Sequence, residues 1–154
     1  MIFYSVGTQL PFDRLTGYLD QWCEETGFSE IIGQVARGHI PKNFKAYDYL
    51  SSDAYKSYFI ESELIVSHAG MGSILTAIEY GKPIVIVPRK FELGEHRNDH
   101  QLSTVKRFRG TCGIYVAENY SELVDILELD SYDSPSISQG AVSLIENLRQ
   151  LIAS

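Results

Sequence analysis

The chain has 154 residues, the size of one domain, and it is 44% hydrophobic and 21% charged, which excludes a disordered or fibrous protein. Its formal net charge of −7 opposes general binding to nucleic acids or anionic membranes, because the summed field repels phosphate. No basic leader precedes the first apolar stretch, and no apolar run approaches the roughly 18 residues of a membrane span, so we expect a cytoplasmic protein. Cys23 and Cys112 lie far apart in no metal-type spacing, and we expect no disulfide between them.

Strand-like apolar runs alternate with helix-length amphipathic segments. We expect strands at 2–6, 29–35, 44–47, 63–67, 83–87 and 112–116, and helices at 11–25, 53–61, 72–80, 98–108, 121–129 and 139–153. This alternation predicts an α/β fold, a Rossmann-like, doubly wound parallel sheet in a single domain. The apolar face of the last helix packs on its own domain, the favoured interpretation, or docks a partner.

Three loops of unusual composition follow strands of this expected sheet. They are Gly7-Thr8-Gln9, the segment 68–73 and the segment 88–100. Ligands of open parallel sheets bind outside the carboxyl ends of the strands, so we expect the three loops to converge on one crevice.

The segment 68–73 has the composition of an anion-binding turn. Gly70 and Gly72 let the backbone approach a ligand, and a helix that begins at about Met71 presents free N–H groups with a partial positive charge. Ser73 adds a hydroxyl and His68 an imidazole N–H. Because each charge-assisted hydrogen bond contributes about 1.5–3 kcal/mol, a diphosphate can be held here without a metal. A Gly-x-Gly pair alone is common in turns, so the residues by themselves indicate an α/β domain with an anion-binding turn.

The charge is unevenly distributed. From Lys82 to Arg109 there are seven basic and three acidic residues, a local +4, which leaves −7 − 4 = −11 for the remainder. This stretch is either a solvated helix face with ion pairs or an edge kept positive to meet phosphate.

Two other classes of enzyme are weaker interpretations. The third glycine of the dinucleotide fingerprint and the Gly-Lys-Ser/Thr ending of a nucleoside-triphosphate loop are both absent after Gly72. A metal hydrolase using His96, Asp99 and His100 is conceivable, since the two histidines are four residues apart. However, the loop character upstream makes a helical pair doubtful, and the glutamate of a zinc-protease motif does not follow His96.

The stretch from Val66 to Pro88, VSHAGMGSILTAIEYGKPIVIVP, followed by Asn98-Asp99-His100-Gln101, resembles the C-terminal domain of family 28 glycosyltransferases. The opening VGTQ-x-PF narrows the resemblance to members in which this domain is a separate polypeptide. These are the catalytic subunit of the eukaryotic dolichol-pathway N-acetylglucosaminyltransferase and bacterial exopolysaccharide and capsule subunits. The segment 94–101, GEHRNDHQ, is more similar to the bacterial group, and the likeness covers about residues 1–128.

The resemblance implies the C-terminal half of a GT-B glycosyltransferase. Such a chain would be the donor-binding catalytic subunit of a two-component inverting enzyme, moving a hexose-type sugar from a UDP-sugar to a polyprenyl-diphosphate-linked acceptor in polysaccharide biosynthesis. It implies no metal or other cofactor, and a general base from the other half. A membrane-associated partner would supply the acceptor site and recruit the chain to the inner face of the membrane. The alternative is a non-catalytic nucleotide-sugar-binding or scaffold subunit.

The resemblance also implies roles for single residues. His68 and Ser73, as catalytic groups, would hold the diphosphate together with Gly70 and Gly72.

Gly7 and Thr8 would line the crevice beside the diphosphate or the acceptor, and the loop after Val87 would flank the uracil. Asp99 and Gln101 match an acidic-x-glutamine pair that binds sugar hydroxyls.

Many relatives have a carboxylate where Thr76 stands, so its expected contact with the ribose is weaker.

Overall fold

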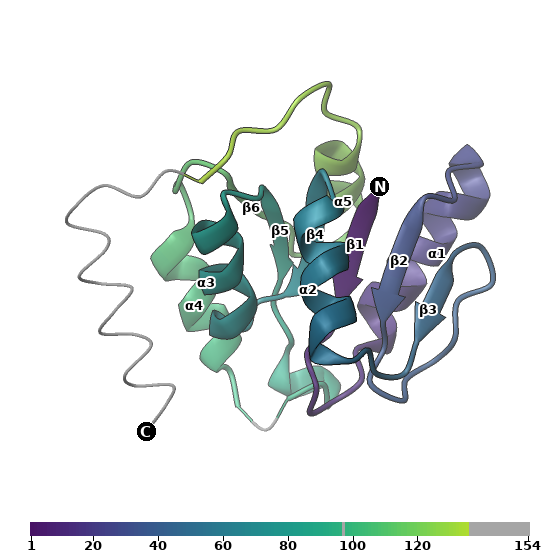
Figure 1. Cartoon of the computed structure of the whole chain (residues 1–154). Coiled ribbons are helices and arrows are strands. Elements are labelled where there is room, and N and C mark those ends of the chain that lie inside the picture. The colour runs from purple at the N-terminus through teal and green to yellow at the C-terminus, as the bar shows by residue number, and fades with distance from the viewer. Residues whose placement is uncertain (97, 136–154) are drawn as a thin grey trace.

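The computed structural model describes residues 1–96 and 98–135 (Figure 1). The predicted helix at 139–153 therefore lies outside the described residues. The strands are β1 (Ile2–Ser5), β2 (Ile31–Gln34), β3 (Lys45–Tyr47), β4 (Leu64–His68), β5 (Ile84–Val87) and β6 (Ile114–Val116). The helices are α1 (Asp13–Thr26), α2 (Ser52–Glu61), α3 (Met71–Tyr80), the 3-10 helix η1 (Phe91–Leu93), α4 (His100–Phe108) and α5 (Tyr120–Leu127).

All strand pairs are parallel, and the sheet order is β3-β2-β1-β4-β5-β6. The predicted doubly wound α/β sheet is thus confirmed. The order reverses between β1 and β4, where Ser5 pairs with Ser67, so the loops that follow these two strands diverge. This is the point at which open α/β sheets bind ligands.

Each face of the sheet has its own hydrophobic core, because side chains alternate along a strand. On β1, Ile2 and Tyr4 pack towards α1 and α5, whereas Phe3 packs towards α2, α3 and α4. Figure 1 shows the helices divided between the two faces in this way. The central strands β4 and β5 are buried on both faces, which explains their continuous apolar sequences.

Element boundaries differ from the expected ones where capping residues decide them. The helix expected from Ser121 begins at Tyr120, because the Asn119 side chain accepts a hydrogen bond from Glu122 N. Helix α2 begins at Ser52, one residue before the expected start, because the Ser51 side chain caps it by accepting from Ala54 N. Helix α4 begins at His100 instead of residue 98, and the expected loop at 88–100 contains η1.

Two further expectations concern covalent and membrane features. Cys23 is buried, Cys112 is exposed, and both are free thiols. In the part of the chain that the structure describes, no helix is both long and apolar enough to cross a membrane.

Candidate functional site

A cavity of about 570 Å³ opens at the carboxyl edge of the sheet, beside the switch point between β1 and β4. The three predicted loops do converge there. Its lining includes most of the residues predicted from the sequence: Gly7, Thr8, His68, Gly70, Gly72, Ser73, Thr76 and Gln101. Asp99 does not line it.

The His68 ring lies between two glycines. A Cβ atom on Gly7 would come within 2.8 Å of His68 Nε2, and one on Gly70 within 2.4 Å of His68 Cε1. Gly7 also has φ +82°, a conformation that L side chains rarely adopt. These glycines therefore leave room for the histidine ring, a reason that the sequence did not reveal.

Gln101 connects the two loops that flank the cavity. Its buried Oε1 accepts from Ala69 N at 3.2 Å and from Arg89 N at 3.0 Å, and its Nε2 lies 3.0 Å from His68 Nδ1. Because two backbone N–H groups identify the amide oxygen, the amide nitrogen must donate to Nδ1. His68 is then the neutral tautomer with its proton on Nε2, beside Gly7 and Gly70.

The electrostatics favour the same neutral form of His68. Burial, followed by the positive charge of Arg89 and the proximity of His96, lowers the pKa of His68 to about 3. The ring keeps some exposure through the cavity, but protein atoms surround most of it. His68 can therefore donate a hydrogen bond from Nε2 to an anion across the neutral pH range, and it is a poor proton acceptor.

The N-terminus of α3 contributes further donors. Gly70 caps the helix, and the first intrahelical bond runs from Ile74 N to Gly70 O, which leaves the preceding N–H groups without helical partners. A Cβ on Gly72 would meet no atom within 4 Å, so a side chain there would project into open space. Thr76 Oγ1 donates to Gly72 O at 2.8 Å and keeps only its acceptor capacity for a ligand.

Asp99 has a different environment from the one expected for a sugar-binding residue. It is exposed at the N-terminal cap of α4, and its Oδ1 accepts from Phe91 N at 3.2 Å. Its contact with a sugar stays a prediction that this geometry does not favour.

The residues weighed for a metal site are also separated. His96 lines the cavity but His100 is exposed at the start of α4. Within residues 1–96 and 98–135, no group of three or more His, Cys, Asp or Glu side chains could hold a metal ion.

Two polar residues that line the cavity were not predicted from the sequence. Gln34 is 2% exposed, donates to Gly7 O at 3.0 Å and accepts from Leu50 N at 2.8 Å. The Tyr55 hydroxyl donates to Ser5 Oγ at 3.1 Å, and its burial raises its pKa. The signal for Gln34 was available, because it is a polar residue at the carboxyl end of an otherwise apolar strand.

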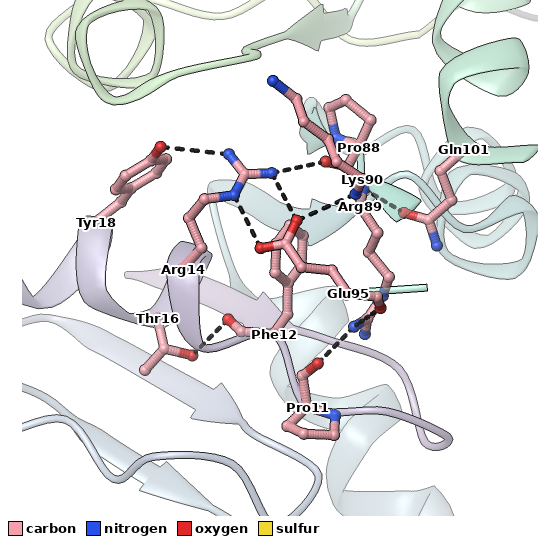
Figure 2. A network of polar contacts seen from close by, with 10 residues as sticks. All are labelled: Pro11, Phe12, Arg14, Thr16, Tyr18, Pro88, Arg89, Lys90, Glu95 and Gln101. Carbon is pink, nitrogen blue, oxygen red and sulfur yellow. Dashed lines mark hydrogen bonds and ion pairs between the residues drawn. The ribbon is translucent and has the colours of Figure 1, made fainter. Parts of the chain in front are cut away.

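The loop between β5 and α4 was predicted to border the site, but its internal network was not. Figure 2 shows Glu95 in a bidentate ion pair with Arg14 of α1, with N···O distances of 2.9 and 3.0 Å. Arg14 also donates to Pro88 O at 3.0 Å, and Lys90 N donates to Glu95 at 3.1 Å. Arg89 is 2% exposed and is one of the residues that line the cavity. One of the seven basic residues of the 82–109 stretch is therefore internal rather than part of a solvated face.

Comparisons with known proteins agree with this geometry. Residues 20–131 match the model of the glycosyltransferase family 28 C-terminal domain. Two curated relatives are named UDP-N-acetylglucosamine transferase subunit ALG13. The human protein is 28% identical over 92% of this chain, and the mouse protein is 33% identical over 68%. The chain spans 14% and 10% of the lengths of these two relatives.

Solved structures share the fold. An NMR structure of ALG13 has a TM-score of 0.63 at 19% identity, covering 99% of this chain and 96% of that one. MurG of Acinetobacter baumannii has a TM-score of 0.61 at 17% identity, covering 82% of this chain and 41% of that one. The family match covers most of the sequence. The loops at the carboxyl edge of the sheet form one cavity at the switch point. The chain therefore belongs to the glycosyltransferase family 28 C-terminal domain family.

Proposed function

We propose that this chain is the donor-binding subunit of a two-component inverting glycosyltransferase that uses a UDP-sugar and a polyprenyl-diphosphate-linked acceptor. The observation that carries this proposal is the convergence of the β1–α1 loop, the β4–α3 turn and Gln101 on one cavity, with the N-terminus of α3 at its wall. A helix N-terminus with unpaired N–H groups suits a diphosphate. The family match and the names of the relatives agree with a nucleotide-sugar donor.

The proposed chemistry is stabilisation of the leaving group. When the acceptor hydroxyl attacks the anomeric carbon and the bond to the diphosphate breaks, negative charge grows on the phosphate oxygens. The N–H groups at the start of α3, the Ser73 hydroxyl and the Nε2 proton of His68 would donate to that charge. These donors are held by the fold before the reaction, so little reorganisation is needed.

The proton of the acceptor hydroxyl must go elsewhere. His68 is a poor base because Gln101 donates to its Nδ1 and its Nε2 already carries a proton. We therefore place the general base in a membrane-associated partner that also holds the lipid-linked acceptor. The basic stretch from Lys82 to Arg109 would face that partner or the lipid diphosphate, and the chain would be cytoplasmic until recruited.

The sugar is the finer part of the proposal. The GEHRNDHQ segment supports a hexose-type sugar for an exopolysaccharide or capsule, through its resemblance to bacterial subunits. The curated relatives are instead named as UDP-N-acetylglucosamine transferase subunits. UDP-glucose, UDP-galactose, UDP-glucuronic acid and UDP-N-acetylglucosamine are therefore the four donors to compare.

Reconstituted transfer tests the proposal. The chain is combined with membranes containing its partner, a polyprenyl-diphosphate-linked sugar and each labelled donor, with and without EDTA. We expect transfer from one donor, strict dependence on both subunits, and a loss of roughly tenfold or more in Ser73→Ala. Ser57→Ala, an exposed serine on α2, is the matched control and should keep full activity. UDP binding without transfer in any reconstitution would favour the scaffold alternative, and absence of both would contradict the proposal.

A further inference from the structure

Arg89 is the largest fully buried side chain of the described core, at 2% exposure. It follows Pro88 at the end of β5, and its guanidinium lies 4.8 Å from the centre of the Phe12 ring. Arginine is almost never fully buried unless its charge is paired, so this position calls for a specific reason.

The guanidinium binds backbone carbonyls of two loops. Its Nη2 donates to Val6 O at 2.6 Å and to Leu10 O at 2.7 Å, and its Nη1 donates to Pro11 O at 2.5 Å, all in the β1–α1 loop. A longer bond of 3.3 Å joins Nη1 to Glu95 O in the β5–α4 loop. Figure 2 shows the contacts to Pro11 and Glu95. The planar guanidinium carries four N–H donors on its two terminal nitrogens and can bind four carbonyls. The single ammonium nitrogen of lysine has only three donors.

The positive charge of Arg89 is not matched by a carboxylate of its own. Among the described residues, the two ion pairs are Arg14–Glu95 and Arg109–Glu118. Glu95 also acts on Arg89 through its charge, but it forms its bidentate contact with Arg14. Two arginines thus share one carboxylate, and the cluster keeps a net charge of +1 next to the cavity.

We propose that Arg89 is a positioning residue of the donor site, which locks the β1–α1 and β5–α4 loops into one wall and keeps a buried positive charge beside the diphosphate. This inference rests on the proposed function and deepens it. Arg89 acts through its neighbours, because four of its five N–H donors bind carbonyls and do not reach a ligand.

Two observations connect this arrangement to an anion. Carbonyl oxygens repel phosphate, and the carbonyls of Val6, Leu10 and Pro11 are bound by Arg89 while that of Gly7 is bound by Gln34. In addition, the charge of Arg89 is the second largest cause of the lowered pKa of His68, so its field acts on a group that lines the cavity. A buried charge is also screened little by salt.

The test distinguishes the effect of the positive charge of Arg89 from its effect on loop geometry. It compares the binding of UDP with that of uridine, which lacks the phosphates. Both affinities are measured by NMR chemical-shift titration in wild type, Arg89→Gln, Arg89→Met and Arg89→Lys. Arg89→Met keeps an apolar contact with Phe12 if the glutamine variant folds poorly. Trimethylamine N-oxide is added where a variant needs it to fold.

We expect the ratio of UDP affinity to uridine affinity to fall roughly tenfold or more in the two neutral variants. In Arg89→Lys both affinities should fall, because the bonds of the guanidinium to the loop carbonyls are lost. The ratio should stay within about threefold of wild type, because the positive charge remains. Lys45→Gln, on the exposed edge strand β3 outside the cavity lining, makes the same change in net charge and should leave the ratio unchanged.

The double variant Arg14→Gln/Glu95→Gln loosens the same loop without changing the net charge. It should weaken both ligands equally. An unchanged ratio in Arg89→Gln and Arg89→Met, or an equal fall of the ratio in the double variant, would overturn this inference alone. Failure of the wild-type chain to bind UDP would overturn the proposed function and the inference together.

Discussion

The two walls of the cavity are built by different physical means. The β4–α3 turn, residues 68–73, is a local structure in which two glycines surround a histidine and a helix begins. The β5–α4 loop, described at residues 88–96 and 98–99, is held by contacts with distant parts of the chain, above all by the ion pair of its own Glu95 with Arg14, 81 positions away. The turn thus owes its shape to backbone geometry, and the loop owes its shape to charge and buried polar contacts.

This difference predicts how each wall fails. A change in the turn should act through steric fit and protonation, and a change in the loop through the loss of ion pairs and hydrogen bonds. The predictions below are ordered from the largest expected effect to the smallest.

Acid should destabilise the turn through His68. Its folded pKa of about 3 lies below the value of about 6.5 for an unfolded histidine, so between these values only the unfolded state binds the proton. Stability should therefore fall as the pH decreases below about 6.5, by up to about 1.4 kcal/mol per pH unit. Urea unfolding of wild type and His68→Gln from pH 7 to pH 4 measures this.

The difference in unfolding free energy between the two proteins should change by about 3 kcal/mol over that interval, in the direction of a relatively weaker wild type at pH 4. The carboxylates titrate in both proteins and cancel. A pH-independent difference would show that His68 is protonated as easily as an exposed histidine.

Removing Gln101 should disconnect the two walls. Gln101→Ala leaves Arg89 N without its buried acceptor, whereas Ala69 N keeps its bond to Val87 O at 3.0 Å, so we expect a cost of about 1–3 kcal/mol in unfolding free energy. It also frees Nδ1 of His68, so UDP affinity should fall in addition to any change in sugar preference. Denaturant unfolding and UDP titration measure the two effects. A change in sugar preference at unaltered stability and UDP affinity would restore the simpler role predicted from the sequence.

Two glycine variants distinguish a glycine that is needed for packing within the turn from one that leaves space for the ligand. Gly70→Ala forces a Cβ against the His68 ring and should cost about 1–3 kcal/mol of stability and also weaken UDP binding. Gly72→Ala meets no protein atom, so stability should change by less than about 1 kcal/mol while UDP binding falls. Thermal unfolding and calorimetry separate these outcomes. Equal UDP affinity in Gly72→Ala and wild type would place the diphosphate elsewhere.

Breaking the ion pair should affect stability less than the loss of Gln101 or the Gly70→Ala change. Glu95→Gln removes a salt bridge whose side chains are 17% and 12% exposed, which we expect to cost about 1 kcal/mol after allowing for solvent screening. Amide hydrogen exchange should rise in residues 88–96 and stay unchanged in the α3 turn. Equal loosening of both walls would contradict the distinction drawn between them.

The same distinction explains what the sequence could predict. The order of strands and helices, the carboxyl-edge loops and the residues of the turn follow from local patterns, and the structure brings Gly7, Thr8, Gly70, Gly72 and Ser73 to one cavity. The Arg14–Glu95 pair and the burial of Arg89 depend on tertiary contacts across about eighty residues, which no local pattern encodes. The bond from Phe91 N to Asp99 was not predicted either, because a motif gives a residue's place along the chain but not the direction of its side chain.

Calorimetry of the isolated chain with UDP tests the central claim most directly. With EDTA present throughout, we predict saturable binding of UDP by wild type, weakened by Ser73→Ala and unaffected by Ser57→Ala. Absence of binding by any uridine nucleotide, with or without the membrane partner, would contradict the account.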